Sequence, residues 1–255
     1  MTINVMNKLS AESIIKELDC LLNKRDYDGA VNHLKSKQIE AEKSGDRETL
    51  VAIYNEQIGI YRKTQQESNC IDAINCAVSV CKELSLENTV TMGTTYLNAA
   101  TGLKSFGKDK EALDYYQKAQ ALYERLLPIG DSRMSGLYNN MAITLTSLGN
   151  YDLAESMFNK AIEIKKNVKN GEADIAITYC NLADFATAKY GIEGAVNYVA
   201  DYLEKAFECL NTPTLPRNGY YAFVSEKCAP VFAEYGYFIY DKILTERAKE
   251  IYDRS

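Results

Sequence analysis

One pattern of small, apolar and aromatic residues returns in this chain at a constant interval of 42 residues. The clearest copy is marked by Tyr138, Met141, Ala142, Leu145, Gly149, Ala154, Phe158 and Ala161. The preceding copies carry Tyr96, Ala99, Ala100, Leu103, Gly107, Ala112, Tyr116 and Ala119, and before them Tyr54, Gln57, Ile58, Tyr61, Gln65, Cys70, Ile74 and Ala77. A unit of this length cannot bury its apolar face alone, so the interval predicts stacked repeats instead of one globular core.

The spacing inside one copy predicts a pair of helices. The first four marks lie at i, i+3, i+4 and i+7, which places their side chains on one face of a helix. Gly149 ends this first helix, because glycine readily takes the left-handed conformation of a helix C-terminus. A second helix is predicted from residue 151 to about residue 166, and its small residues let the two helix axes approach closely. No convincing alternating pattern of a strand appears, so the chain is predicted to be all-α.

Looser copies extend the array on both sides. Upstream, Leu18, Tyr27 and Ala30 take the corresponding places. Downstream, a copy begins at Tyr179 but needs about one extra helical turn before Ala206. We therefore predict a single solenoid over residues 1–255. Its six repeats have the approximate bounds 10–45, 46–87, 88–130, 131–171, 172–212 and 218–255.

Turn-forming stretches separate the copies, among them "KSGDRE", "LENT", "PIGDS" and "KNGEAD". A polar side chain just before a helix can accept a hydrogen bond from an unpaired backbone N–H of the first turn. The candidate N-caps are Asp46, Asn88, Ser132 and Asp174.

The repeat resembles the tetratricopeptide repeat (TPR). The stretch "YNNMAITLTSLGNYDLAESMFNKAIEI" of this chain matches the signature of that repeat closely. The resemblance covers nearly the whole chain and is firmest over residues 50–165. It implies a right-handed α-α superhelix of about six helix-turn-helix repeats. Two departures matter: Glu124 and Lys166 stand where the common 34-residue form has a closing Pro, and the period is 42. Both features, and the string "LYNNMA", are similar to the kinesin-light-chain type of repeat.

Composition narrows the classes of partner. The formal net charge of −6 and the pI of about 5.1 disfavour nucleic acid and anionic membrane surfaces, because both need clustered positive charge. No apolar run approaches the length of a membrane span, and "MTINVMNKLSAESIIKELD" lacks the pattern of a secretory signal. The 7 Cys form no CxxC pair and the chain has 1 His, so no metal site and no cofactor is predicted. We expect a cytoplasmic protein with reduced thiols.

The resemblance implies that a protein or an extended peptide binds along the first helices of the repeats. The register predicts which side chains line this groove. They are Asn55, Glu56, Arg62 and Lys63 in the second copy, Asn98, Thr101 and Lys104 in the third, Asn139 and Asn140 in the fourth, and Asn181 and Asp184 in the fifth.

Asn98, Asn140 and Asn181 stand at equivalent positions, each two residues after the leading Tyr. An Asn side chain offers both a donor and an acceptor, so a row of them can bind an extended backbone of any sequence. In the repeat proteins that the chain resembles, this Asn does contact the main chain of the peptide. The alternative is that each Asn only bonds to a neighbouring helix or faces water.

Arg62, Lys63 and Lys104 are predicted to lie on the same surface. They could receive an acidic peptide or a C-terminal carboxylate, or they could simply be solvated. The Lys/Asn carboxylate clamp of co-chaperone repeat proteins is not reproduced, because Asn55 and Gly59 do not supply that combination.

Tyrosine is concentrated near the end of the chain, where residues 179–255 hold 10 of the 19. The run "AEYGYFIYDK" has more aromatic residues than one helix face can bury. Aromatic residues are enriched at interfaces, so we expect a homodimer or partner surface in these repeats. The alternative is that they cap the open end of the solenoid.

The chain offers little for catalysis. His33 lies in the weak first copy, and no nucleophile elbow, P-loop, HExxH or dinucleotide motif appears, so no catalytic residue is predicted. We expect a non-catalytic protein- or peptide-binding scaffold. The alternative is a regulatory peptide sensor of the bacterial TPR-receptor type, which changes curvature on binding; repeats fill these 255 residues, with no basic recognition helix. An enzyme subunit built on repeats is a distant third.

Overall fold

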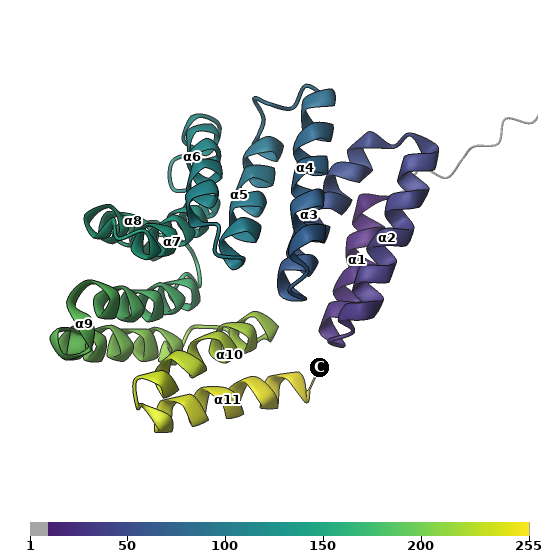
Figure 1. Ribbon diagram of the computed structural model, residues 1–255. Helices are drawn as coiled ribbons and strands as arrows, with labels where there is room; N and C mark the ends of the chain where they lie inside the picture. The colour runs from purple at the N-terminus through teal and green to yellow at the C-terminus, as the bar shows by residue number, and fades with distance from the viewer. Residues whose placement is uncertain (1–9, 255) are drawn as a thin grey trace, which may run out of the picture. The chain divides into compact units, whose positions relative to one another are not determined.

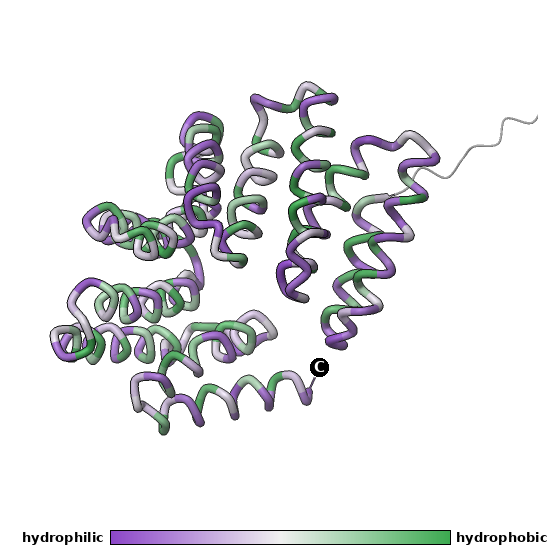
Figure 2. The backbone as a smooth tube through the Cα atoms, in the orientation of Figure 1, coloured by the Kyte–Doolittle hydropathy of each residue, from purple (hydrophilic) through white to green (hydrophobic). Residues whose placement is uncertain are grey.

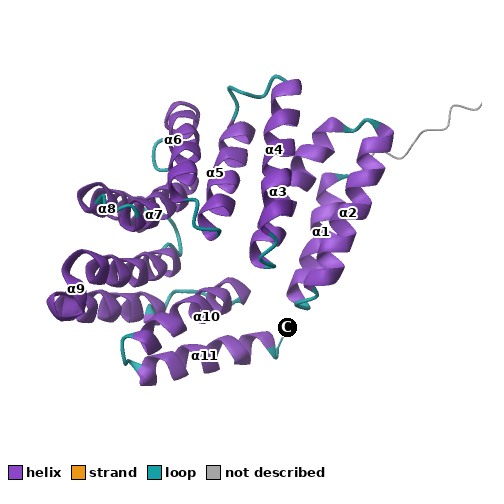
Figure 3. Ribbon diagram, viewed as in Figure 1, coloured by secondary structure: helices purple, strands orange, loops and turns teal. Residues whose placement is uncertain are grey.

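The computed structural model describes residues 10–254, and within that range every regular element is a helix (Figure 3). The all-α prediction is confirmed. The chain separates into two compact units, one ending at Leu127 and the other beginning at Pro128. Each unit has its own helix pairs and its own core.

Unit 1 is built of three consecutive helix pairs (Figure 1). Its helices are α1 (Ala11–Asn23), α2 (Tyr27–Ser44), α3 (Arg47–Lys63), α4 (Glu67–Glu83), α5 (Val90–Ser105) and α6 (Asp109–Leu126). The small and aromatic marks of the repeat form its core, because the side chains of Ala99, Ala100, Ala112, Tyr116 and Ala119 are 0% exposed. The Ala residues permit close approach of α5 and α6, and Tyr116 fills the remaining space.

Unit 2 contains α7 (Ser132–Ser147), α8 (Tyr151–Lys166), α9 (Glu172–Asn211), α10 (Gly219–Glu234) and α11 (Phe238–Tyr252). The predicted second helix of the fourth copy, residues 151–166, coincides with α8. Gly149, with φ +77°, takes the left-handed conformation between α7 and α8. Hydrophilic and hydrophobic residues intermix along every helix (Figure 2), as expected for helices that bury one face and expose the other.

The fifth repeat differs from the others because its two helices are not separated by a loop. α9 runs for 40 residues and is interrupted only at Gly191, with φ 73° and ψ 169°. That conformation is practically restricted to glycine, and it lets the chain reverse within one residue. Tyr190 and Tyr198 stack across the bend at 4.9 Å between ring centroids. Residues 172–190 therefore act as a first helix, and residues 192–211 as a second.

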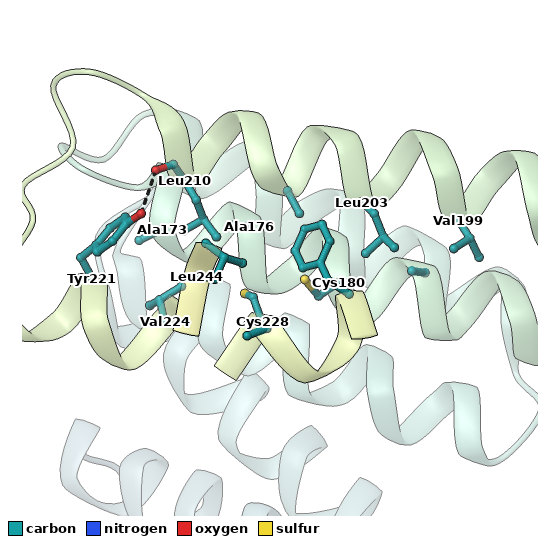
Figure 4. Packing of buried hydrophobic residues seen from close by; sticks show 14 of the residues in the cluster. Ala173, Ala176, Cys180, Val199, Leu203, Leu210, Tyr221, Val224, Cys228 and Leu244 are labelled. Carbon is teal, nitrogen blue, oxygen red and sulfur yellow. Dashed lines mark hydrogen bonds between the residues drawn. The ribbon is translucent and has the colours of Figure 1, made fainter. Parts of the chain in front are cut away.

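The core of unit 2 is built mainly around the two halves of α9. Ala173, Ala176 and Cys180 of the first half face Leu203 and Leu210 of the second half (Figure 4). In the same view Tyr221, Val224 and Cys228 of α10 and Leu244 of α11 complete the cluster.

The N-cap predictions are confirmed only in part. Asp46 caps α3 by accepting a hydrogen bond from the backbone N–H of Thr49 at 3.1 Å. The other three are wrong: the caps of α5, α7 and α9 are Thr89, Asp131 and Gly171. Asn88 and Ser132 each miss by one residue, because an equally suitable side chain stands next to them. Asp174 lies inside α9 and forms an ion pair with Lys165.

Candidate functional site

In each unit the first helices of successive pairs contact one another: α1 with α3, α3 with α5, α7 with α9, and α9 with α10. Each keeps one stripe of residues in solvent. In α9, for example, Asn181 is half-buried and Asp184 is exposed, while Leu182, Ala183 and Phe185 between and beside them are buried. We call the solvent side of α1, α3 and α5 the first-helix face of unit 1. The solvent side of α7, residues 172–190 of α9, and α10 is the first-helix face of unit 2.

Paired asparagines join neighbouring stripes in both units. The Asn98 side-chain amide donates to Asn55 Oδ1 at 2.8 Å, and the Asn181 amide donates to Asn139 Oδ1 at 2.9 Å. These bonds run from one first helix to the next, so the stripes that they connect form a continuous surface within each unit. The structure therefore brings together four of the predicted Asn residues in two pairs.

The asparagine pairs are fixed by further bonds and keep polar atoms for other partners. The Asn55 amide also donates to the Val51 carbonyl at 2.8 Å and to Thr95 Oγ1 at 3.1 Å. Among residues 10–254, no hydrogen bond reaches Oδ1 of Asn98 or of Asn181. Each amide group also has two N–H donors, of which one is used. Asn140, the third member of the predicted row, accepts a long bond of 3.4 Å from its neighbour Asn139.

Two of the three predicted basic residues contact other side chains of the protein, which makes them less available to bind a partner. Lys63 Nζ lies 4.8 Å above the ring of Tyr27, and Lys104 lies 3.9 Å from Asp109. Arg62 is exposed. Thr101 donates to the Leu97 carbonyl and lies 3.2 Å from the Tyr116 hydroxyl, so this side chain is committed to its own repeat.

Glu56 and Asp184 are acidic members of the predicted set. Removal from water and the nearby carboxylate of Asp19 raise the pKa of Glu56. Partial removal from water raises the pKa of Asp184 to about 6, against the hydrogen bond from Tyr235 that lowers it, and Glu234 adds to the rise. The Tyr235 hydroxyl donates to Asp184 Oδ1 at 3.1 Å and lies 3.0 Å from Thr187 Oγ1.

An aromatic pair on α10 was absent from the predicted set. Tyr220 is 48% exposed and Phe223 is 47% exposed, with ring centroids 6.2 Å apart. Lys227 Nζ lies 5.8 Å from the Phe223 ring centroid. Tyr220 donates to Asp174 Oδ1 at 2.7 Å, and Lys165 neutralises that carboxylate at 2.9 Å. The spacing 220, 223, 227 is that of a single helix stripe, which is the signal in the sequence that could have identified the pair.

Most of the C-terminal tyrosines take part in packing. Tyr221 is 1% exposed, and Tyr179, Tyr202, Tyr235, Tyr237 and Tyr240 pack partly buried against the core of unit 2. The exposed apolar residues beyond the first-helix face in this region include Ile192, Val196, Phe238 and Ile239.

His33 has a structural environment. Its ring contacts the Ile14 carbonyl through Nε2 at 3.1 Å and the Glu17 carboxylate through Nδ1 at 3.6 Å, and so links α2 to α1. Within residues 10–254, no cluster of three or more His, Cys, Asp or Glu residues has the geometry to hold a metal ion. No helix in the described part of the chain has both the length and the apolar character of a membrane span.

Comparison with known proteins connects this geometry to a family. Sequence profiles of the tetratricopeptide repeat match residues 133–191 and residues 93–131. No curated protein matches the chain significantly. Members of the TPR family are generally non-catalytic.

Several solved structures share the fold. BtubC (BKLC) from P. vanneervenii is 23% identical with a TM-score of 0.66, over 78% of this chain and 80% of that one. A Podosopora anserina protein assigned to the kinesin light chains, with nearly identical TPR-like repeats, is 13% identical with a TM-score of 0.54, over 78% and 92%. A Rap protein complexed with competence and sporulation factor is 15% identical with a TM-score of 0.59, over 96% of this chain and 64% of that one.

The repeat signature, the helix pairs and the neighbours agree. They support a protein-interaction scaffold. Residues 93–131 and 133–191 carry tetratricopeptide repeats, and the fold of the chain is similar to that of kinesin-light-chain-like repeat proteins.

Proposed function

We propose that this protein binds extended segments of partner polypeptides along its first-helix faces, and that it acts by binding and not by catalysis. One observation carries the proposal: in both units, asparagine pairs bridge successive first helices, and the half-buried donor Asn of each pair has a carbonyl oxygen and an N–H group with no bond among residues 10–254.

The chemistry suits a peptide backbone. An extended chain presents alternating N–H and C=O groups, and an Asn side chain can pair with either. Because each amide is held by a bond to the next helix, it does not have to be ordered when the partner binds, and this lowers the entropic cost of association. The two interpretations of the Asn row are thus compatible: an Asn can bond to a neighbouring helix and still contact a peptide.

A peptide sensor is the second candidate, favoured by one comparison. The Rap protein that was crystallised with competence and sporulation factor matches 96% of this chain in fold. A sensor of that kind would change shape on binding. A change in the radius of gyration by small-angle scattering after addition of a bound peptide would favour the sensor, and an unchanged radius would favour the passive scaffold.

A homodimer is a subsidiary proposal. Ile192 is 81% exposed and Ile239 is 75% exposed, and such residues are costly to leave in water. Sedimentation velocity of the wild type and of Ile192→Lys would show whether a dimer exists and whether it needs the exposed Ile192 side chain. The buried free thiols of Cys70, Cys81 and Cys180 also fit a reducing compartment such as the cytoplasm.

The proposed function is tested with random decapeptides displayed on phage and selected on the immobilised protein. We expect specific peptides to be enriched, and we expect Asn98→Ala combined with Asn140→Ala to weaken their binding while the helical circular dichroism is kept. Failure to enrich any peptide, or equal binding to the double variant, would contradict the assignment of the first-helix faces.

A further inference from the structure

The first-helix face of unit 2 has two edges of different chemistry. Toward the C-terminal ends of the helices lie Asp184 and Glu234, and no ion pair of the described residues includes Asp184. Toward the N-terminal ends lie Tyr220 and Phe223, beside an Asp174 that Lys165 already neutralises. The Asn181 amide stands between the two edges.

Three contacts between α9 and the segment 219–235 show how far apart these edges lie along the helix axis. Tyr220 bonds to Asp174, Cys180 lies against Cys228, and Tyr235 bonds to Asp184. Phe223 is therefore level with residue 176 or 177 of α9, seven or eight residues before Asp184. At about 1.5 Å per residue the aromatic and acidic edges are roughly 10–12 Å apart along the helix axis.

An extended peptide that crosses α9 and α10 over Asn181 would meet both edges. Neighbouring helix axes are about 8–10 Å apart, which an extended chain covers in about three residues. Side chains three positions apart in an extended chain point to opposite sides, because the period is two. The side chain above α9 would then reach the acidic edge while the one above α10 reaches the aromatic edge.

The available atoms define what each edge would accept. Tyr235 occupies Oδ1 of Asp184, and Oδ2 has no hydrogen bond among residues 10–254. Partial removal from water and the like charge of Glu234 hold this carboxylate in an unfavourable environment, which a cation would relieve. Lys227 lies on the aromatic side, against Phe223. The paired rings of Tyr220 and Phe223 offer a half-exposed apolar surface.

We propose that the first-helix face of unit 2 selects an extended segment of a partner protein in which a Lys or Arg residue and an apolar residue stand three positions apart, the cation on Asp184 and the apolar side chain on Tyr220 and Phe223. This inference deepens the proposed function and rests on it. It assigns a basic, amphipathic partner segment instead of the acidic one that Arg62, Lys63 and Lys104 suggest.

The phage-displayed decapeptides test the inference when selected on wild-type protein and sequenced. We expect Lys or Arg to be enriched, with an aromatic or aliphatic residue three positions away in either direction. Asp184→Asn, which keeps the acceptor for Tyr235, should weaken the selected peptides about three- to tenfold, as for a charge-assisted hydrogen bond at a partly exposed site. Asp152→Asn on α8 makes the same charge change off the face and should have no effect.

Phe223→Ser tests the aromatic edge, with Phe238→Ser on α11 as its control; both rings are exposed, so neither change should unfold the protein. Enriched peptides that are acidic or neutral, or basic peptides that bind Asp184→Asn and Asp152→Asn equally, would overturn this inference and leave the proposed function standing. If no peptide is enriched, both fail.

Discussion

The two first-helix faces share a hydrogen-bonded asparagine pair and differ in the residues that surround this pair. Asn55–Asn98 in unit 1 and Asn139–Asn181 in unit 2 are the same bridge between successive first helices. Beyond the bridge, unit 1 has Thr101 bonded to its own repeat and Lys104 paired with Asp109. Unit 2 has Asp184, which forms no ion pair among residues 10–254, and exposed rings on α10.

Under the proposed function, this difference separates recognition of any peptide backbone from recognition of particular side chains. The amide bridges recur with the repeat and can contact any peptide backbone. The acidic and aromatic edges occur in unit 2, where the repeats diverge from the consensus, and we propose that they contact the side chains of the partner. We therefore expect both units to contribute affinity, and unit 2 to contribute most of the sequence preference.

The strongest test of the two-unit description removes a core ring from one unit. Phe158 is 0% exposed and packs edge-on against Phe185 at 5.9 Å. Phe158→Ala should cost about 3–5 kcal/mol, because it leaves a cavity in the core of unit 2. Hydrogen exchange should accelerate in peptides from α7 to α11, while peptides from α1 to α5 stay protected.

The matching change in unit 1, Tyr116→Ala, removes an equivalent buried ring and should give the opposite pattern. Loss of protection across both units in either variant would show that the repeats unfold as one cooperative solenoid.

Two glycines sharpen the comparison of packing. A Cβ at Gly93 of α5 would lie 2.6 Å from the buried ring of Tyr123, whereas a Cβ at Gly136 of α7 meets nothing within 4 Å. Gly93→Ala should destabilise by about 1–3 kcal/mol through overpacking. Gly136→Ala should stabilise by about 0.5–1 kcal/mol, since alanine is the better helix former. Urea denaturation measures both, and equal effects would contradict the described packing.

Single asparagine variants ask whether both faces bind. Asn98→Ala and Asn181→Ala each remove one bridge and one contact to the peptide, and each should weaken a bound peptide by about 1 kcal/mol, or roughly fivefold. Isothermal titration calorimetry with a phage-selected peptide measures the loss. A loss with only one of the two variants would confine binding to that unit.

The smallest expected effect concerns Asp184 and pH. Its pKa is raised from 3.8 to about 6 in the folded protein, so its favourable contribution to stability is complete below pH 3.8 and is lost as the pH rises through about 6. At pH 7, Asp184→Asn should therefore melt slightly higher than wild type, and the rise should be only about 2 °C because the group is exposed. At pH 3.5 the two proteins should have the same melting temperature. Thermal melts of Asp152→Asn provide the control. A lower melting point for Asp184→Asn at pH 7 would contradict the raised pKa.

Much of the fold follows from the spacing of a few residues. The 42-residue interval is sufficient to predict helix pairs because Ala and aromatic residues at fixed intervals can pack in few other ways. α8 is predicted to the residue, since Gly149 ends the preceding helix with a conformation that few residues can take. The continuous α9 is not predicted. From the sequence alone, the stretch around Gly191 is taken as an extra helical turn, and only the positive φ of Gly191 shows that the chain reverses there.

The candidate site is less predictable than the fold. The register identifies which residues of a first helix face solvent, and so it finds Asn55, Asn98, Asn139 and Asn181. It does not identify their partners, because the bridge joins positions 42 or 43 residues apart on different helices. The cation–π contact of Lys63 with Tyr27 and the ion pair of Lys104 with Asp109 likewise depend on the path of neighbouring helices.

Photo-crosslinking tests the central claim most directly. A phage-selected peptide that carries benzoylphenylalanine would be irradiated on the protein, and the modified residues mapped by mass spectrometry. We predict adducts on the solvent stripes of first helices, such as α7, residues 172–190 of α9, and α10. Adducts confined to second helices such as α8 and α11 would contradict the account.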